Sequence, residues 1–163
     1  MLLRSVPLRA GPLRVAVSYT SAVAEARIGG DLYEVVASPH GVRVIVGDVQ
    51  GKGLAAVETA ALVLGAFREA AHDEPDRMGV GERLERSVAR ELEGEKFVTA
   101  ILAESGSDHE VVFLNYSHPD PVGVRRDCTT DFPQPPSYAL PLAPSIRSPT
   151  GRTCCKPLML TAP

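Results

Sequence analysis

The sequence predicts an α+β domain in which an antiparallel sheet carries helices on a face. Strand-forming segments occur in two groups, with two helical segments between them. The groups are 13–20, 31–37 and 42–48, then 97–103 and 109–115. Grouped strands favour antiparallel pairing, because successive parallel strands need a long crossover connection. The element order therefore disfavours a doubly wound parallel sheet, in which strands and helices alternate.

The first three strands are predicted from alternation and from turn residues. In LRVAVSYT, residues 13–20, apolar side chains recur at every second position, which is the period of a strand. Residues 21–30, which end in a Gly-Gly pair, are predicted to form a loop. The segments DLYEVVA at 31–37 and VRVIVGD at 42–48 flank the turn sequence Pro39-His40-Gly41, so we expect them to pair as a hairpin.

The first predicted helix covers residues 54–73, which contain no proline and are rich in alanine and leucine. Apolar residues at helical spacing predict that this helix is mostly buried. The predicted buried stripe is Leu54, Val57, Ala61 and Leu64, with Val63, Phe67 and Ala70 beside it. The predicted exposed face is nearly confined to Glu58, Arg68 and Glu69.

The second predicted helix covers residues 76–93 and has a narrower apolar stripe, formed by Val80, Leu84, Val88 and Leu92. Glu82 and Arg86 are four residues apart, so they are expected to pair on its solvent side. Two strands follow, FVTAILA at 97–103 and HEVVFLN at 109–115, with Gly106 in the turn between them.

After Ser117 the periodicity stops, and short extended pieces are predicted only at 138–142 and 157–161. Ten of the 14 prolines and all three cysteines lie between Pro119 and Pro163. The formal charge is −5 for residues 1–118 and +2 for residues 119–163. Three cysteines with an adjacent pair, Cys154-Cys155, fit neither a disulfide framework nor the usual zinc spacing, so we expect reduced thiols.

Length and composition limit the class of protein. The 163 residues fit one globular domain, with 44% apolar and 23% charged residues. A net charge of −3 has no basic excess, which argues against a nucleic-acid binder. No apolar run approaches the roughly 20 residues of a spanning helix, and the N-terminus lacks the pattern of a signal peptide. We therefore expect a cytoplasmic protein with no membrane segment.

Two aspartates are the main candidates for chemistry. If the predicted hairpin turns at about residue 40, residues equally distant from that point lie opposite each other, which places Asp31 near residues 48–49. Asp31 and Asp48 would then meet at the open end of the hairpin, beside glycines. Paired carboxylates of this kind suit a hard divalent cation such as Mg²⁺ or Mn²⁺. The alternative is that Asp48 caps a turn and Asp31 simply opens a strand on the surface.

The glycine-rich segment after Asp48 does not match a phosphate-binding loop. Such a loop needs four residues between its first glycine and Gly-Lys, followed by Ser or Thr. Here Gly47 and Gly51 enclose three residues, and Gly53 follows Lys52. The glycines are instead expected to let backbone carbonyls approach an ion and to let the chain turn into the helix at 54.

Four motifs, in this order, resemble those of the PPM-type (type 2C, metal-dependent) serine/threonine phosphatases, in particular the bacterial SpoIIE/RsbU-like branch. They are G-G-D-L-Y at 29–33, G-D-V-Q-G-K-G at 47–53, F-V-T-A at 97–100 and N-Y-S-H-P at 115–119. The likeness runs from about Leu13 to Pro119 and continues more faintly to about Leu142. It divides the chain into a lead-in at 1–12, a partial phosphatase core at 13–118 and a proline-rich, degenerate segment at 119–163.

The resemblance implies a β-sandwich with flanking antiparallel helix pairs and a binuclear Mn²⁺ or Mg²⁺ site. The metal aspartates of the family correspond to Asp31 and Asp48, and the backbone carbonyl ligand corresponds to Val49. Family members use a metal-activated water to hydrolyse phosphoserine or phosphothreonine on anti-anti-sigma (STAS-type) proteins, and so regulate sigma factors. The resemblance implies the same reaction and partner here, with no covalent phospho-enzyme.

The sequence departs from the family after the fourth motif. The family's Tyr-Thr-Asp-Gly motif and its last metal aspartate have no counterpart, and no Asp or Glu follows Asp131. One metal position would keep Asp31, Asp48 and the Val49 carbonyl, whereas the second would keep mainly Asp48. We therefore expect an incomplete sandwich and strongly reduced or absent hydrolysis. The alternatives to an active phosphatase are an impaired pseudophosphatase or binding module, and a non-functional truncated or frameshifted fragment.

Two further side chains near these motifs have simpler interpretations. His118, in the fourth motif, is expected to shape its loop rather than to bind metal. Lys52 could steer a phosphate towards the metals or could simply be a solvated loop lysine.

Overall fold

The structure is a computed structural model and describes residues 5–18, 30–92, 96–106, 110–125, 127–132, 138–139 and 142. Its helices are α1 (Leu54–Asp73) and α2 (Arg77–Glu91). Its longer strands are β3 (Asp31–Ser38), β4 (Gly41–Val49), β5 (Val98–Ser105) and β6 (Val111–Tyr116). Two-residue strands complete the list: β1 (Arg9–Ala10), β2 (Leu13–Arg14), β7 (Gly123–Val124), β8 (Thr130–Asp131) and β9 (Tyr138–Ala139).

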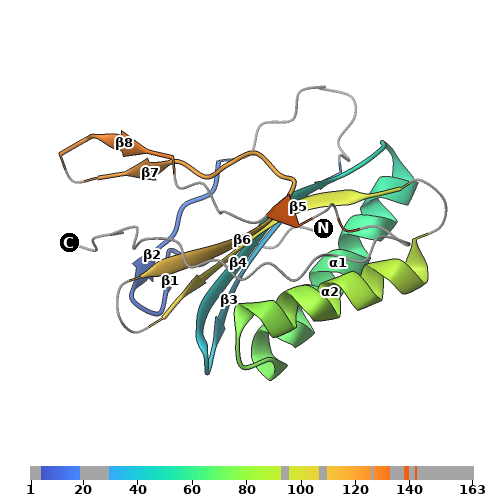
Figure 1. Ribbon diagram of the computed structural model, residues 1–163, viewed down its shortest axis with the longest axis horizontal. Coiled ribbons are helices and arrows are strands. Elements are labelled where there is room, and N and C mark those ends of the chain that lie inside the picture. The colour runs from blue at the N-terminus through green and yellow to red at the C-terminus, as the bar shows by residue number, and fades with distance from the viewer. Residues whose placement is uncertain are drawn as a thin grey trace.

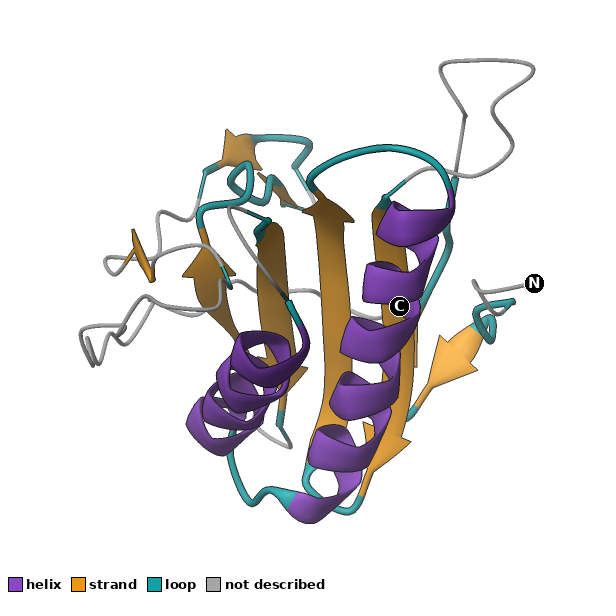
Figure 2. Ribbon diagram, turned by 90° about the vertical axis from the view of Figure 1, so that its right-hand side faces the viewer, coloured by secondary structure: helices purple, strands orange, loops and turns teal. Residues whose placement is uncertain are grey.

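One sheet with the strand order β3-β4-β5-β6-β9 organises the fold. Its pairs are antiparallel except β6–β9, which is parallel. Both helices cover the same face of this sheet (Figures 1 and 2). The predicted α+β class, with grouped antiparallel strands and two helices between the groups, is confirmed.

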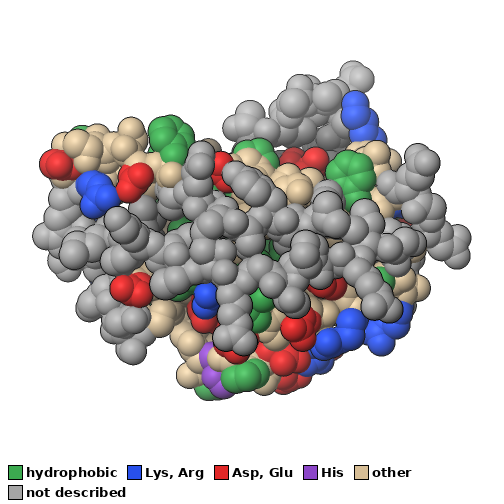
Figure 3. Space-filling model, viewed as in Figure 1, with side chains coloured by type: hydrophobic (Ala, Val, Ile, Leu, Met, Phe, Trp, Pro, Cys, Tyr) green, Lys and Arg blue, Asp and Glu red, His purple; other side chains and the backbone are tan. Residues whose placement is uncertain are grey.

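The core lies between the sheet and the helix pair. Helix α1 contributes Val63, Leu64 and Phe67, and the facing strands contribute residues such as Ile45 and Leu102, all nearly inaccessible to solvent. In Figure 3 charged side chains gather along the lower edge, over the helix pair. On the helix pair, Arg83 of α2 forms ion pairs with Glu69, Asp73 and Glu74. The helices thus have one apolar face and one solvated face.

Helix α1 has the predicted ends, but its buried stripe differs from the predicted one. Leu54 is 70% exposed and Ala61 is also exposed, so placing them in the stripe was wrong. The buried residues are Ala56, Thr59, Ala60, Val63, Leu64, Phe67, Ala70 and Ala71. A helix made largely of alanine and leucine has apolar residues on most sides, so several stripes fit the same sequence. The sheet, rather than the pattern, selects among them.

Helix α2 begins at the Asp76 cap, whose carboxylate accepts a hydrogen bond from the backbone N–H of Gly79 at 2.9 Å. Its predicted stripe is confirmed, since Val80, Leu84, Val88 and Leu92 are all buried. The predicted pair of Arg86 and Glu82 is also present, with 3.8 Å between Nη1 and Oε2.

The prediction of a strand at 13–20 was wrong for most of its length. Only Leu13–Arg14 is a strand, and it pairs with Arg9–Ala10 across a turn in which Gly11 has φ 53°. Residues 15–18 are not in a strand, and 19–20 lie outside the described residues. Val15 keeps one backbone hydrogen bond, from its N–H to the carbonyl of Leu8 at 3.1 Å, whereas Val17 is 43% exposed.

Part of the region after Ser117 forms short strands, of which β9 pairs with the main sheet and β7 and β8 form a separate pair. The structure adds the β7–β8 pair, which the sequence did not predict, and β9 lies within the extended piece predicted at 138–142. Leu142 is buried and exchanges two backbone hydrogen bonds of 2.9 Å with Val98. The piece predicted at 157–161, and the Cys154-Cys155 pair, lie outside the described residues. The division at residue 118 stays a prediction.

Cys128 is exposed and free. Among the described helices, neither is long and apolar enough to span a bilayer.

Helix α2 approaches the sheet closely at Gly81. A Cβ atom at this position would lie 2.2 Å from the Tyr116 hydroxyl and 2.8 Å from Cδ2 of Leu114. Burial raises the pKa of Tyr116, and the charge of Glu85, to which its hydroxyl donates, raises it further. Tyr116 therefore stays a neutral donor inside the core.

Replacing Gly81 by alanine is expected to destabilise the domain by about 1–2 kcal/mol. Overpacking against β6 costs about 1–3 kcal/mol, and the gain of roughly 1 kcal/mol in helix propensity only partly offsets it. Urea unfolding measures the change. Gly65→Ala is the matched control, because a Cβ there meets nothing within 4 Å; it should be neutral or stabilising. Equal effects of the two variants would contradict the close packing of α2 on β6.

Candidate metal centre

The hairpin of β3 and β4 brings Asp31 and Asp48 directly opposite each other. The register runs from Ser38 opposite Gly41 at the turn to Asp31 opposite Asp48 at the open end. The predicted register is therefore confirmed. Both aspartates are exposed, and directly opposed residues share a sheet face with Cβ atoms about 4.5–5.5 Å apart. The adjacent residues Leu32 and Val49 are buried in the helix-covered core.

The two carboxylates repel each other across the strands. Partial burial raises the pKa of Asp48, and the negative charge of Asp31 raises it further. His118 and a hydrogen bond from the backbone of Val49 act in the opposite direction and lower the pKa of Asp48. Two like charges in such a position are stabilised by a nearby cation.

Gly30 allows two oxygen atoms to converge beside Asp31. A Cβ atom on Gly30 would lie 2.3 Å from the carbonyl oxygen of Val49 and 3.1 Å from Oδ1 of Asp48. The backbone N–H of Val49 in turn donates to the carbonyl of Gly30 at 3.0 Å. The space next to Gly30 is therefore lined by one carbonyl and one carboxylate oxygen. Oxygen donors of these two types fit Mg²⁺ or Mn²⁺.

The loop after Asp48 turns the chain from β4 into α1. Gly51 and Gly53 have φ values of 114° and 77°, which favour glycine, so the predicted role of these glycines in the turn is confirmed. Gln50 donates from its backbone to the carbonyl of Phe97 at 3.0 Å, which fixes the start of the loop. Lys52 in this loop is exposed.

His118 lies in the loop after β6, on the side of the site where β5 pairs with β4. Its backbone N–H donates to Oδ1 of Asn115 at 2.8 Å, and Nδ2 of Asn115 donates to its carbonyl at 2.9 Å. Its ring Nδ1 lies 3.0 Å from Oγ1 of Thr99, the residue that pairs with Asp48 in the sheet. Burial lowers the pKa of His118, whereas the charges of Asp48 and Asp31 raise it.

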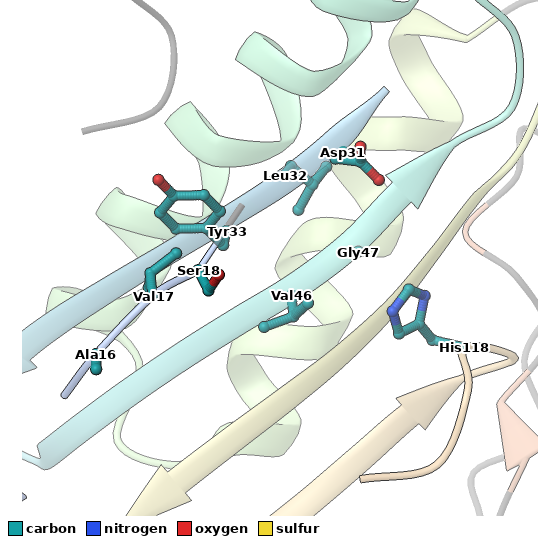
Figure 4. Close-up of a pocket in the computed structure, with 9 residues that line it drawn as sticks. All are labelled: Ala16, Val17, Ser18, Asp31, Leu32, Tyr33, Val46, Gly47 and His118. Carbon is teal, nitrogen blue, oxygen red and sulfur yellow. The ribbon is translucent and has the colours of Figure 1, made fainter. Parts of the chain in front are cut away.

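A shallow cavity of about 470 Å³ adjoins the aspartate pair. Asp31 and His118 line it together with apolar side chains such as Val17 and Val46 (Figure 4). The sequence predicts that the two aspartates meet, but it does not predict Thr99 or the ring of His118 as their neighbours. The signal was present in the third and fourth motifs, F-V-T-A and N-Y-S-H-P, which contain these residues.

The described residues offer a carboxylate pair rather than a larger ligand cluster. Among them, no group of three or more His, Cys, Asp or Glu side chains is arranged to hold a metal ion. The roles of Asp31, Asp48 and Val49 as metal ligands stay a prediction.

Comparison with known proteins identifies the family. The family model described as Stage II sporulation protein E (SpoIIE) matches residues 38–152, well over half of the chain. The chain therefore belongs to the SpoIIE family, within the PPM-type phosphatases. The matched span includes Asp48, Thr99 and His118, and it begins after Asp31. No curated protein matches the chain.

Two solved structures are similar. The crystal structure of the RsbU and RsbW domains of Rv1364c from Mycobacterium tuberculosis has a TM-score of 0.70 and 21% identity, over 86% of this chain and 38% of that chain. The SiaA-PP2C domain of Pseudomonas aeruginosa has a TM-score of 0.48 and 19% identity, over 54% of this chain and 37% of that chain. The first match shows that the fold is that of an RsbU-like domain. This chain spans well under half the length of either protein.

Proposed function

We propose that the chain is a protein serine/threonine phosphatase domain that hydrolyses phosphoserine or phosphothreonine on a regulatory partner of the anti-anti-sigma (STAS) type. Asp31, Asp48 and the carbonyl of Val49 would hold Mn²⁺ or Mg²⁺. The observation that carries the proposal is the direct pairing of Asp31 with Asp48 beside Gly30, in a chain of the SpoIIE family.

The donor set explains what each residue would do. Asp31 and Asp48 would supply negative charge to the ion, and Val49 would supply a neutral oxygen. Gly30 keeps the space beside these oxygens open. When bound, a divalent cation would offset phosphate charge and lower the pKa of water. The family is metal-dependent in general, so the donor types and the family agree.

The comparison with the RsbU and RsbW domains supports a regulatory protein as the partner. In the Mycobacterium tuberculosis protein an RsbU domain and an RsbW domain occur in one chain. This supports a partner from a related regulatory system for the present chain. The apolar lining of the cavity next to Asp31 would contact the residues that flank the phosphorylated side chain.

Calorimetry and a chromogenic phosphate ester test the proposal. We expect residues 1–163 to bind Mn²⁺ and to hydrolyse p-nitrophenyl phosphate only when Mn²⁺ is present. Asp48→Asn should weaken Mn²⁺ binding by more than about 100-fold, beyond the effect of residues that only support a ligand, and should abolish turnover. Asp131→Asn is the matched control, because Asp131, on β8, forms an ion pair with Arg125 and lies outside the proposed site. Unchanged Mn²⁺ binding by Asp48→Asn would contradict the proposal.

A second candidate is a binding module that engages the STAS-type partner without hydrolysis. The described residues favour it in one respect, since no group of three or more of their His, Cys, Asp or Glu side chains is arranged to hold a metal ion. Retained partner binding without turnover would support this candidate. A poorly dispersed NMR spectrum of the purified chain would instead support a non-functional fragment.

A further inference from the structure

The loop that carries His118 is fixed by its own backbone contacts. Asn115 is 0% exposed and bonds both the N–H and the carbonyl of His118. The same Nδ2 also donates to Asp120 at 3.1 Å. Because Asn115 performs the loop-shaping, the imidazole ring is not needed for it. The expected role of His118 in shaping the loop is thus met by its backbone.

The ring is held by Thr99 through one of its two nitrogens. Nδ1 of His118 lies 3.0 Å from the Thr99 hydroxyl, which is also 3.5 Å from the carbonyl of Asp48. This contact engages Nδ1 and leaves Nε2 on the other side of the ring. Nε2 carries a proton when the Thr99 hydroxyl donates to Nδ1 of the neutral ring, and also when the ring is protonated.

The ring lies where an anion would need a donor. In Figure 4 it projects from the loop after β6 towards Gly47 and Asp31. Among the described residues that line the cavity, Ser18, Tyr33 and His118 carry side-chain donors. The Tyr33 hydroxyl points away from His118 in the same view. A phosphoryl group beside two carboxylates needs donors as well as a cation to offset repulsion.

We propose that His118 contacts the substrate and donates a hydrogen bond from Nε2 to an oxygen of the phosphoryl group beside Asp31 and Asp48. This inference rests on the proposed function for the location of the phosphoryl group. The contact would orient the group, because Thr99 and Asn115 hold both the ring and its backbone. His118 would then contact both the substrate and Thr99 of β5, the residue that pairs with Asp48.

Two substitutions separate the two ring nitrogens. His118→Asn places its side-chain amide near the position of Nδ1, where the amide oxygen can accept from Thr99 or the amide nitrogen can donate to it, and the variant loses the donor at Nε2. His118→Gln places its amide nitrogen near the position of Nε2 and so keeps the donor. The histidine control is His40→Gln, at the exposed turn between β3 and β4, at the opposite end of the hairpin from Asp31.

The readout is calorimetric binding of inorganic phosphate to the Mn²⁺-loaded protein, with Mn²⁺ binding measured separately. We expect His118→Asn to weaken phosphate binding by about tenfold or more, as for a lost hydrogen bond to a charged group. His118→Gln should recover most of that loss, and His40→Gln should match the wild type. Mn²⁺ binding without phosphate should change less than about twofold.

Each result decides the inference separately from the proposed function. Unchanged phosphate binding in His118→Asn, with hydrolysis by the wild type intact, would overturn the inference and leave the function standing. A loss of Mn²⁺ affinity equal to the loss of phosphate affinity would overturn it by making His118 a metal ligand. Absence of phosphate binding by the wild type would overturn it as well. His118-dependent phosphate binding without hydrolysis would support it while removing the enzymatic function.

Discussion

Replacing Gly30 with alanine is expected to weaken Mn²⁺ binding by about tenfold or more and to leave the domain folded. The added Cβ would lie 2.3 Å from the Val49 carbonyl oxygen, a backbone atom that can move only with its strand. The same Cβ would press on Oδ1 of Asp48 at 3.1 Å. Both oxygens belong to the proposed ligand set, and displacements around a metal ligand typically cost 10–100-fold in affinity.

The Gly30 experiment needs a folding readout beside the binding readout. Calorimetry gives the Mn²⁺ affinity, and thermal unfolding followed by circular dichroism shows whether the sheet survives. Gly65→Ala is again the matched control, since open space surrounds that position. If Gly30→Ala binds Mn²⁺ as tightly as the wild type, then the Val49 carbonyl is not part of the site.

The carboxylate pair could be predicted because the position of the turn alone determines which residues of a hairpin lie opposite each other. Once Pro39-His40-Gly41 is taken as the turn, counting outwards pairs every residue, and Asp31 meets Asp48 at the end of the count. A shift of one residue would have moved each side chain to the other face of the sheet. The site thus follows from a local turn and a regular period, both of which are visible in a short sequence window.

The faces of β4 could not be predicted in the same way. Its sequence alternates Val42, Val44 and Val46 with Arg43 and Ile45, so the valine face has the more apolar pattern. The structure instead places Arg43 and Ile45 under the helices and leaves Val46 46% exposed. Arg43 is tolerated there because its partners come from β5 and α1, which are remote in sequence.

The position of the His118 ring at the site is a second feature that the sequence alone could not predict. His118 lies three residues after Asn115, and the Asn115 side chain bonds the backbone of His118 within the same loop. The contact with Thr99 joins residues 19 positions apart on different elements. That contact exists only because β5 lies between β4 and β6 in the sheet. Strand order, unlike hairpin register, depends on the whole chain.

Replacing Arg43 with methionine is expected to destabilise the domain by about 3–5 kcal/mol, the range for breaking a buried ion pair. Arg43 is only 2% exposed. Its Nε donates to Glu104 at 2.8 Å, and its Nη1 donates to the carbonyls of Ala71 at 3.0 Å and Glu74 at 2.6 Å. Nη2 lies 2.8 Å from the same Glu104 oxygen but without hydrogen-bond geometry. Methionine would leave a largely buried carboxylate and two carbonyls at the end of α1 without this donor.

Urea unfolding of the single and double variants separates the charge from the packing. Arg86→Met removes an exposed ion pair, 3.8 Å from Glu82, and should cost no more than about 0.5 kcal/mol. Glu104→Gln combined with Arg43→Met should recover part of the loss, because the uncompensated charge is gone while the carbonyls of Ala71 and Glu74 still lack their donor. If the Arg43→Met variant does not fold, a folded double variant would still show that removing the charge of Glu104 recovers stability, and Glu104→Gln alone gives the reference for that comparison. A loss at Arg43 no larger than that at Arg86 would mean that the guanidinium does not join α1 to the sheet.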